Sequence, residues 1–455
     1  MKPPGPPNRL GLGNFRGMMR DPLGFMTAAA EYGPIVDIQL LFEPYCLAVD
    51  PALIQQALTQ GNSVMHKDRF THQLSRVMGQ GLITSEGELW RKQRKLVSHA
   101  FTPRRIRSYG DSMVAATHRS LDRWSDGDEL DIHASMAELT LDVIGRTLFD
   151  ADVRGDAREV GEALQVFSDF YGDVLESPFA PPNWWPTPRM ARFRRGIRNV
   201  DRILGDIIQE RRQSGEDRGD LLSALLQAQD DGGAGMSDRQ LRDECITLFL
   251  AGHETTSLAL ANTFYLLSQH PEIERRVHTE VVEVLGDRAG TSDDVERLAY
   301  AERAIKESMR LYPPVYATGR LLLEDYELGG YTIKKGTNLL FVQWVTHRHP
   351  DYFPNPLEYD PDRWRPERAQ TVHKYAYFPF GGGPRICIGN HFAMMEAVLL
   401  LATIIREYRL ELIPGQTLEL KPSVTLRPAQ GLRMKLVARH SSKSLQKSRA
   451  AAGSS

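Results

Sequence analysis

The sequence predicts a mainly α-helical domain with a small β region, and two observations carry that prediction. From Leu89 onward, most segments repeat apolar residues every three or four positions, which is typical of amphipathic helices. Strand-like pieces bounded by turn residues occur within residues 34–50 and 319–342. No internal repeat or second domain is visible. We therefore expect residues 1–440 to form a single domain and the basic, serine-rich residues 441–455 to form a disordered tail.

The N-terminal half should consist of a proline-rich extended arm, two short strands and a series of helices. Prolines exclude a helix from residues 177–190, where Trp184 and Trp185 stand side by side. These tryptophans either line an entrance, contact a lipid surface or simply pack the loop. The amphipathic helical pattern covers residues 89–101, 112–124, 135–149 and 200–213.

The C-terminal half should be organised by one very long helix, from about Asp238 to Gln269. Its centre is apolar on nearly every face, so we expect it to be buried. Two more helices should cover residues 271–286 and 301–312, and two prolines end the second. A proline-rich coil then leads into a glycine-rich loop and a last helix that starts near Asn390.

Composition excludes several functional classes. The 455-residue chain has a formal net charge of -2, so no overall field favours nucleic acid or an anionic membrane. No apolar run reaches the ~18 residues of a membrane-spanning helix, and the N-terminus lacks the apolar core of a secretory signal. Three cysteines without paired spacing argue against a disulfide framework. We therefore expect a cytoplasmic protein without a transmembrane segment.

Cys387 stands out among the cysteines because of its surroundings. A lone cysteine is most often a small buried hydrophobic residue. Here, glycines at 381–383 permit a tight loop whose amides can point at the sulfur, and the following helix directs its positive N-terminus at the same place. Both effects favour the thiolate, which would act as a nucleophile or as a metal ligand.

The familiar cysteine sites lack their partner residues. No second cysteine or histidine lies at zinc-ligand spacing, and the zinc-protease pattern that His253-Glu254 begins fails at Ser257. A cysteine protease is possible in principle, but no diagnostic partner arrangement is visible. Haem iron, in contrast, needs only one thiolate from the protein.

Four stretches of the chain resemble known signatures. Phe380 to Gly389, FGGGPRICIG, matches F-x-x-G-x-R-x-C-x-G, the haem-binding signature of the cytochrome P-450 superfamily, at every specified position. Trp90–Arg94 resembles the family's W-x-x-x-R, AGHETT at residues 251–256 its A-G-x-[DE]-T-T, and Glu307–Arg310 its E-x-x-R. The resemblance spans nearly the whole chain, to about Val437. It implies the cytochrome P-450 fold, a triangular helix-rich domain with a small β region, and a soluble bacterial-type haem-thiolate monooxygenase.

The resemblance also implies roles for the matched residues. Cys387 would be the axial ligand of haem b, Thr255 the alcohol that hydrogen-bonds the oxygen substrate, and Glu254 the acid that feeds protons through water. Arg363, from the proline-rich coil, should complete a buried structural group with Glu307 and Arg310. The implied haem contacts are Trp90, Arg94, Ala251, Gly252, Arg320, Phe380, Arg385 and Gly389.

The helix that carries AGHETT has its own physical logic. Small Ala251 and Gly252 should let a flat macrocycle approach the backbone. A threonine hydroxyl can bond back to an earlier carbonyl and open the helix into a groove. A carboxylate at Glu254, within so apolar a helix, is otherwise hard to justify.

The expected substrate is lipophilic, because the regions that match the family's substrate wall are rich in apolar residues. Hydroxylation and epoxidation are equally available outcomes. The segments around Trp90, Glu254 and Cys387 resemble bacterial and eukaryote-like family members that hydroxylate fatty acids, and this resemblance favours a fatty acid, while terpenoids, steroids and polyketides stay open. The implied pocket residues are Val77, Phe170, Leu248, Ala251, Val315, Ala317 and Val424.

Electrons should come from a separate protein, because the sequence contains no flavin or iron–sulfur segment. We expect a ferredoxin or flavodoxin with its NAD(P)H reductase, O2 as co-substrate, no nucleic acid partner and a monomeric enzyme. Arg91, Lys92 and Lys95 form either a docking patch for an acidic partner or a solubilising face. The alternatives are a peroxide-driven or isomerising reaction on the same haem, a non-catalytic haem sensor, and a thiol nucleophile.

Overall fold

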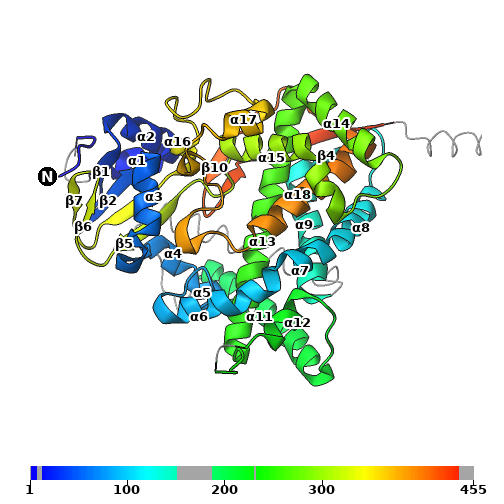
Figure 1. The fold of residues 1–455 in the computed structure, drawn as a ribbon, viewed down its shortest axis with the longest axis horizontal. Helices are drawn as coiled ribbons and strands as arrows, with labels where there is room; N and C mark the ends of the chain where they lie inside the picture. The colour runs from blue at the N-terminus through cyan, green and yellow to red at the C-terminus, as the bar shows by residue number, and fades with distance from the viewer. Residues whose placement is uncertain (1, 8–12, 151–186, 230–231, 440–455) are drawn as a thin grey trace, which may run out of the picture.

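One helix, α13 (Asp238–Gln269), runs through the middle of the molecule and organises the elements around it (Figure 1). The computed structural model describes residues 2–7, 13–150, 187–229 and 232–439. Helix α13 begins with a capping box, in which the side chains of Ser237 and Gln240 each accept a hydrogen bond from the backbone N–H of the other. The predicted range of this helix is confirmed, and most of its side chains are buried.

Helices pack against α13 from several sides. α9 (Ile132–Phe149), α11 (Pro188–Ser214), α15 (Ala299–Leu311) and α18 (Asn390–Glu407) all contact it, and α18 also packs against α8 (Gly110–Leu121) and α14 (Pro271–Leu285). The predicted starts of α18 at Asn390 and of α14 at Pro271 are confirmed. The shorter helices are α1 (Phe15–Arg20), α2 (Pro22–Ala29), α3 (Pro51–Thr59), α4 (Arg69–Gln73), α5 (Ser75–Met78), α6 (Gly87–Ser98), α7 (Pro103–Ser108), α12 (Leu221–Gln227), α16 (Gln343–Thr346) and α17 (Pro366–Ala369).

The main sheet lies at the opposite side of the molecule from most helices (Figure 1). The main sheet has the order β1-β2-β8-β5-β3, and both regions predicted to contain strands contribute to it. Its strands β2 and β8 are parallel, while the other neighbouring pairs are antiparallel. The members are β1 (Ile35–Leu40), β2 (Glu43–Ala48), β3 (Met65–Lys67), β5 (Thr318–Leu322) and β8 (Asn338–Phe341).

Three smaller sheets complete the β structure. The largest has the order β4-β12-β9 and brings residues 129–131 together with the C-terminal part of the chain. The other two are hairpins, β6 with β7 and β10 with β11. Their strands are β4 (Glu129–Asp131), β6 (Tyr326–Leu328), β7 (Tyr331–Ile333), β9 (Tyr408–Leu412), β10 (Leu420–Pro422), β11 (Leu426–Pro428) and β12 (Arg433–Ala438). Among the described residues, none of the helices combines the length and the apolar character needed to span a bilayer.

A buried ionic group ties α15 to the proline-rich coil. The Glu307 carboxylate accepts hydrogen bonds from Arg310 (2.8 and 2.9 Å), from Arg363 (3.1 Å) and from the indole N–H of Trp364 (2.9 Å). Arg310 and Arg363 also donate to backbone carbonyls of the coil between residues 347 and 358. The structure therefore brings together the three residues expected to form a structural group, and the coil they hold leads directly to the loop of Cys387.

We expect Arg363→Ala to lower the free energy of unfolding by about 3–5 kcal/mol, because it leaves the fully buried Glu307 carboxylate short of a counter-charge. Urea unfolding of the two proteins side by side measures the difference. Arg365→Ala is the matched control, since that arginine is half exposed and its pair with Asp362 should contribute less than about 1 kcal/mol. Equal losses in the two variants would contradict a structural role for Arg363.

Candidate functional site

A cavity of about 430 Å³ lies between α13 and the loop that carries Cys387. Its walls come from α13, from α4 to α6 and the loop between them, from residues 314–320, and from the turn at residues 424–425. Phe170, a predicted pocket residue, and Trp184 and Trp185 lie outside the described residues. The other predicted pocket residues all line this cavity: Val77, Leu248, Ala251, Val315, Ala317 and Val424.

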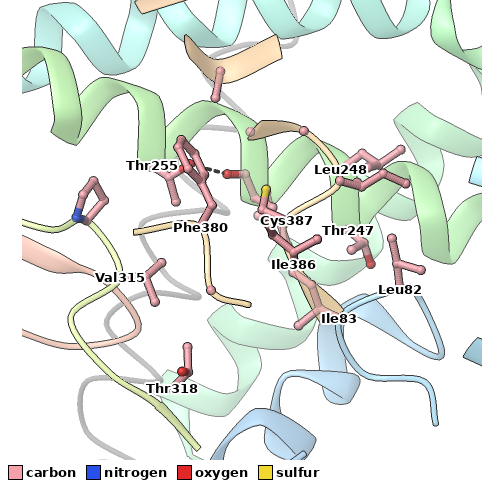
Figure 2. Close-up of a pocket in the computed structure, with 18 of the residues that line it drawn as sticks. Leu82, Ile83, Thr247, Leu248, Thr255, Val315, Thr318, Phe380, Ile386 and Cys387 are labelled. Carbon is pink, nitrogen blue, oxygen red and sulfur yellow. Dashed lines mark hydrogen bonds between the residues drawn. The ribbon is translucent and has the colours of Figure 1, made fainter. Parts of the chain in front are cut away.

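Cys387 lies in the wall of the cavity, and its sulfur points toward α13 (Figure 2). The tight loop before it depends on glycine, because Gly383 has φ +63° and a Cβ there would meet the carbonyl oxygen of Leu58 at 2.0 Å. The Cys387 N–H donates to the carbonyl of Phe380 at 2.9 Å, so the loop folds back on itself. The Cys387 side chain is exposed to the cavity, but desolvation by the surrounding protein raises the pKa of its thiol. The N–H of Gly389 and the charge of Arg94 oppose that rise without cancelling it, so the expected preference for the thiolate does not follow from these residues alone. Phe380 and Gly389 both line the cavity beside the sulfur.

Across the cavity, the middle of α13 carries the predicted threonine. The Thr255 hydroxyl donates to the Ala251 carbonyl at 2.7 Å (Figure 2), which is the backward bond expected to open a groove in the helix. Gly252 lines the cavity too, but its missing side chain makes room for the neighbouring helix. A Cβ on Gly252 would lie 2.5 Å from the Ile144 side chain of α9. The sequence-based explanation for Gly252 was therefore incomplete, because the glycine also leaves room for the end of the Ile144 side chain where α9 packs against α13.

Glu254 has partners that sequence reasoning missed. Its carboxylate forms an ion pair with Arg427 of β11 and accepts a hydrogen bond from the Thr425 hydroxyl at 2.6 Å. Burial acts to raise the pKa of Glu254, but the charge of Arg427 and the hydrogen bond from Thr425 outweigh it, and the pKa lies below its ordinary value. The carboxylate is thus ionised and held toward β11. The arginine lies far away in the sequence, so no local pattern could have indicated this pair.

Cationic side chains collect at one rim of the cavity. Arg94, Arg320 and Arg385, which the sequence suggested as haem contacts, line it, and so does Lys67, which the sequence did not single out. Lys67 sits opposite Arg320 in the pairing of β3 with β5, and knowledge of that register would have found it. Burial lowers the pKa of Lys67 well below its usual range, and burial also lowers the pKa of Arg320. In the described part of the chain, no ion pair involves Lys67, Arg94 or Arg320.

Arg385 is the exception at this rim, because it already has partners. It forms an ion pair with Glu86 and donates to the Ser85 carbonyl at 2.8 Å. Its guanidinium lies 4.0 Å from the centre of the Trp90 ring, a cation–π contact. Burial lowers the pKa of Arg385 to about 10, although Glu86 opposes that shift. Trp90 therefore supports Arg385 through its ring face.

The residues around the cavity fit an iron porphyrin. Such a cofactor needs an axial ligand, apolar walls above and below a flat ring, and cations for two carboxylates. Cys387 can supply the first and the helix and loop residues the second. The rim cations are the observation that tests the fit: Arg320 is buried and Lys67 and Arg94 are partly buried. A buried charge without an ion-pair partner is costly, and the two carboxylates would supply partners. No group of three or more histidine, cysteine or acidic side chains suited to holding a bare metal ion occurs within the described ranges.

Comparisons with known proteins agree with this geometry. The chain matches the family model described as Cytochrome P450 over residues 3–436. It is 36% identical over 411 residues to cyclooctat-9-en-7-ol 5-monooxygenase of Streptomyces melanosporofaciens, covering 90% of this chain and 89% of that protein. It is 32% identical over 424 residues to pentalenene oxygenase of Streptomyces avermitilis, covering 93% and 94%. The crystal structure of the cytochrome P450DA haem domain matches with a TM-score of 0.86 at 30% identity, covering 96% of this chain and 97% of that one.

Proposed function

Because the chain belongs to the cytochrome P450 family and is a cytochrome P450 monooxygenase, we propose that its substrate is a terpenoid hydrocarbon or alcohol. The reaction uses O2, two electrons and two protons. One oxygen atom enters a C–H bond as a hydroxyl group, or an alkene as an epoxide, and the other leaves as water. The observation that carries the proposal is the apolar wall facing Cys387, in a chain with two relatives named as oxygenases of terpenoids.

The shape and charge of the cavity favour a terpenoid over a fatty acid. Branched aliphatic side chains reach it from separate elements, among them Ile83, Leu248 and Val315 (Figure 2), so they surround a rounded hydrocarbon from several sides. A fatty acid would in addition need a cation for its carboxylate. The cations that line the cavity are gathered at the rim with Arg320 and Arg385, where the carboxylates of the cofactor would bind. We therefore place terpenoids ahead of the fatty acids that the sequence favoured.

Cys387 would hold the iron of haem b, and Lys67, Arg94, Arg320 and Arg385 would bind its carboxylates. When bound, a thiolate-ligated haem activates O2 for insertion into an unreactive carbon. The chain's own task is to keep the sulfur in place and to keep water out. The loop fixed by Gly383 and the bond from the Cys387 N–H to the Phe380 carbonyl perform the first, and the apolar walls perform the second.

Thr255 and Glu254 would handle the protons. The Thr255 hydroxyl lies at the cavity surface and is anchored by its bond to Ala251, so its oxygen can accept a proton from one side and pass one to the other. Glu254, the residue just before Thr255 on the helix, is connected to β11 through Arg427 and Thr425. Because Arg427 stabilises the ionised carboxylate, Glu254 has to loosen from Arg427 when it takes up a proton.

The electron donor would be a ferredoxin or flavodoxin reduced from NAD(P)H by its own reductase. Arg91, Lys92 and Lys95 are exposed on α6, the helix that also carries Trp90 and Arg94 at the cavity rim. An acidic carrier docked on this helix would sit close to the cofactor edge, and opposite charges would speed the encounter.

The visible spectrum of the haem-loaded protein tests the proposed site and substrate together. After reduction under carbon monoxide we expect the strongly red-shifted Soret band of thiolate ligation. Titration with cyclic terpene hydrocarbons and alcohols should change the spectrum with dissociation constants at least about tenfold below those of straight-chain fatty acids.

Cys387→Ser is the control for the ligand, and it should lose the red-shifted band. An unaltered band in that variant refutes the assignment of Cys387. Tighter binding of fatty acids than of every terpenoid in the panel refutes the substrate class while leaving the ligand assignment intact.

Replacing Thr255 should separate electron use from product formation. In Thr255→Ala we expect product formed per electron pair to fall about tenfold or more, with hydrogen peroxide released instead, because the hydroxyl no longer guides protons. Product, peroxide and NAD(P)H consumption are measured in one reconstituted assay. Thr255→Ser keeps the hydroxyl and should restore most of the coupling; wild-type coupling in Thr255→Ala would remove this residue from the proton path.

Charge reversal on α6 tests the proposed docking face. The double variant Lys92→Glu/Lys95→Glu should raise the KM for the electron carrier on the order of tenfold at low salt, with a smaller effect at high salt because ions screen exposed charges. Lys335→Glu, an exposed lysine in the strand-rich region, is the control. Equal effects of the two changes would place the docking face elsewhere.

A further inference from the structure

A short segment between α5 and α6, residues 79–84, lies directly against the N-terminal half of α13; we call it the wall loop. Its backbone donates two hydrogen bonds to acidic side chains of the helix. The N–H of Gln80 donates to Asp243 at 2.8 Å, and the N–H of Leu82 donates to Glu244 at 3.0 Å. Arg242 adds a bond to the carbonyl of Val77 at 3.1 Å, just before the loop. Three successive residues of α13 thus hold the loop.

The contact between loop and helix is close enough to need a glycine. A Cβ on Gly81 would meet the Thr247 hydroxyl oxygen at 2.0 Å and the Asp243 carbonyl oxygen at 2.7 Å. On its other side the loop is held by α6, where Gln93 donates to the Gln80 carbonyl at 2.7 Å. The wall loop is therefore clamped between two helices, with its peptide groups bonded to side chains rather than to a sheet.

The wall loop forms part of the substrate cavity. Leu82 and Ile83 line the cavity near Thr247 and Leu248 of α13 (Figure 2), and Met78 lines it just before the loop. If the loop moves off α13, this apolar wall moves with it. The hydrogen bonds that the loop donates to Asp243 and Glu244 therefore help to keep this wall in place.

Glu244 is the unusual member of this clamp. It is fully buried, and only one of its carboxyl oxygens has a partner; Oε1 has none among the described residues. Burial raises the pKa of Glu244 to about 8, the charge of Asp243 adds to the rise, and the Leu82 N–H opposes it. An acid in this position keeps its proton in neutral solution.

The other charges around this end of α13 are already paired. Arg242 forms ion pairs with Asp243 (2.7 Å) and with Asp201 of α11. Arg211 of α11 pairs with Asp220, the N-cap of α12, at 2.7 Å, and Asp220 lies near enough to act on Cys245, the residue after Glu244. No described cation is paired with Glu244, so its negative form has no counter-charge.

We propose that Glu244 is a positioning residue that holds the wall loop against α13 while it is protonated, and that its ionisation releases the loop and weakens substrate binding. The proposal rests on the proposed function in one respect, namely that substrate occupies the cavity that Leu82 lines. The loop contact itself does not depend on which substrate binds.

The direction of the effect follows from linkage. In the released loop, water reaches Glu244 and its pKa returns toward the ordinary value of 4.5, whereas in the closed loop it is about 8. The closed form therefore binds more protons than the open form. Its stability relative to the open form is greatest below pH 4.5 and decreases as the pH rises toward about 8. Loop opening should increase by up to about 100-fold between pH 6 and pH 9.

Hydrogen exchange of the ligand-free holoenzyme tests the proposal. We expect the amides of Gln80 and Leu82 to lose protection by up to about 100-fold from pH 6 to pH 9, after correction for the intrinsic rate. In Glu244→Gln the amide side chain stays neutral and can still accept from Leu82, so this pH dependence should disappear. Glu396→Gln is the matched control: Glu396 of α18 is also buried, and burial raises its pKa to about 8, but it does not contact the wall loop. That variant should keep the wild-type pH dependence of the loop.

Ligand affinity provides the second readout. For any ligand that binds the wild-type cavity, the dissociation constant should rise from pH 6 to pH 9 in wild type and stay flat in Glu244→Gln. Unchanged protection of the wild-type loop across this range overturns the proposal, even if Glu244→Gln fails to fold. Retained pH dependence in Glu244→Gln, or a loop that opens without any change in affinity, overturns it as well. Failure of every terpenoid to bind would contradict the substrate class, while the ligand-free exchange still decides the role of Glu244.

Discussion

The buried carboxylate of Glu307 is the contact on which the rest of the site depends. It binds two arginines and a tryptophan, and those arginines bind the carbonyls of a coil that has no regular structure of its own. A coil with so many prolines cannot form a ladder of backbone hydrogen bonds, so side chains have to take over that task. The loop of Cys387 follows this coil, so the ionic group also fixes the position of the loop relative to α13.

Charged side chains with different roles occupy different parts of the molecule. Cations without ion-pair partners in the described part of the chain stand at one rim of the cavity, where carboxylates of a cofactor would meet them. Arg427 holds Glu254 ionised in the middle of α13, and Glu244 is kept neutral by burial near the helix start. Two carboxyl groups of one helix thus differ in protonation because their neighbours differ: Glu254 has an arginine and a threonine hydroxyl, whereas Glu244 has only a backbone N–H.

The sequence allowed the large elements and the proximal side of the site to be predicted. Helix α13 was found within its true bounds because a capping residue, a long apolar run and a following proline mark it locally. The Cys387 loop was found because its glycines and its helix stand next to the cysteine in the chain. What was missed is non-local: Arg427 meets Glu254 from β11, and Lys67 meets Arg320 only through strand register. The explanation for Gly252 was incomplete for the same reason: Ile144, the side chain for which it leaves room, belongs to another helix.

The parallel pairing of β2 with β8 has a consequence for how the protein is made. Tyr45 stands opposite Asn338 in that pair, so the first strands of the chain cannot complete their sheet until residue 341 has left the ribosome. At ordinary rates of translation the nascent N-terminal hairpin waits on the order of tens of seconds with one edge open. Biosynthesis of this protein therefore includes an interval in which an unfinished β edge needs shelter from other nascent chains. The cofactor cavity is completed only after that interval, because Cys387 and Val424 follow residue 341 in the chain.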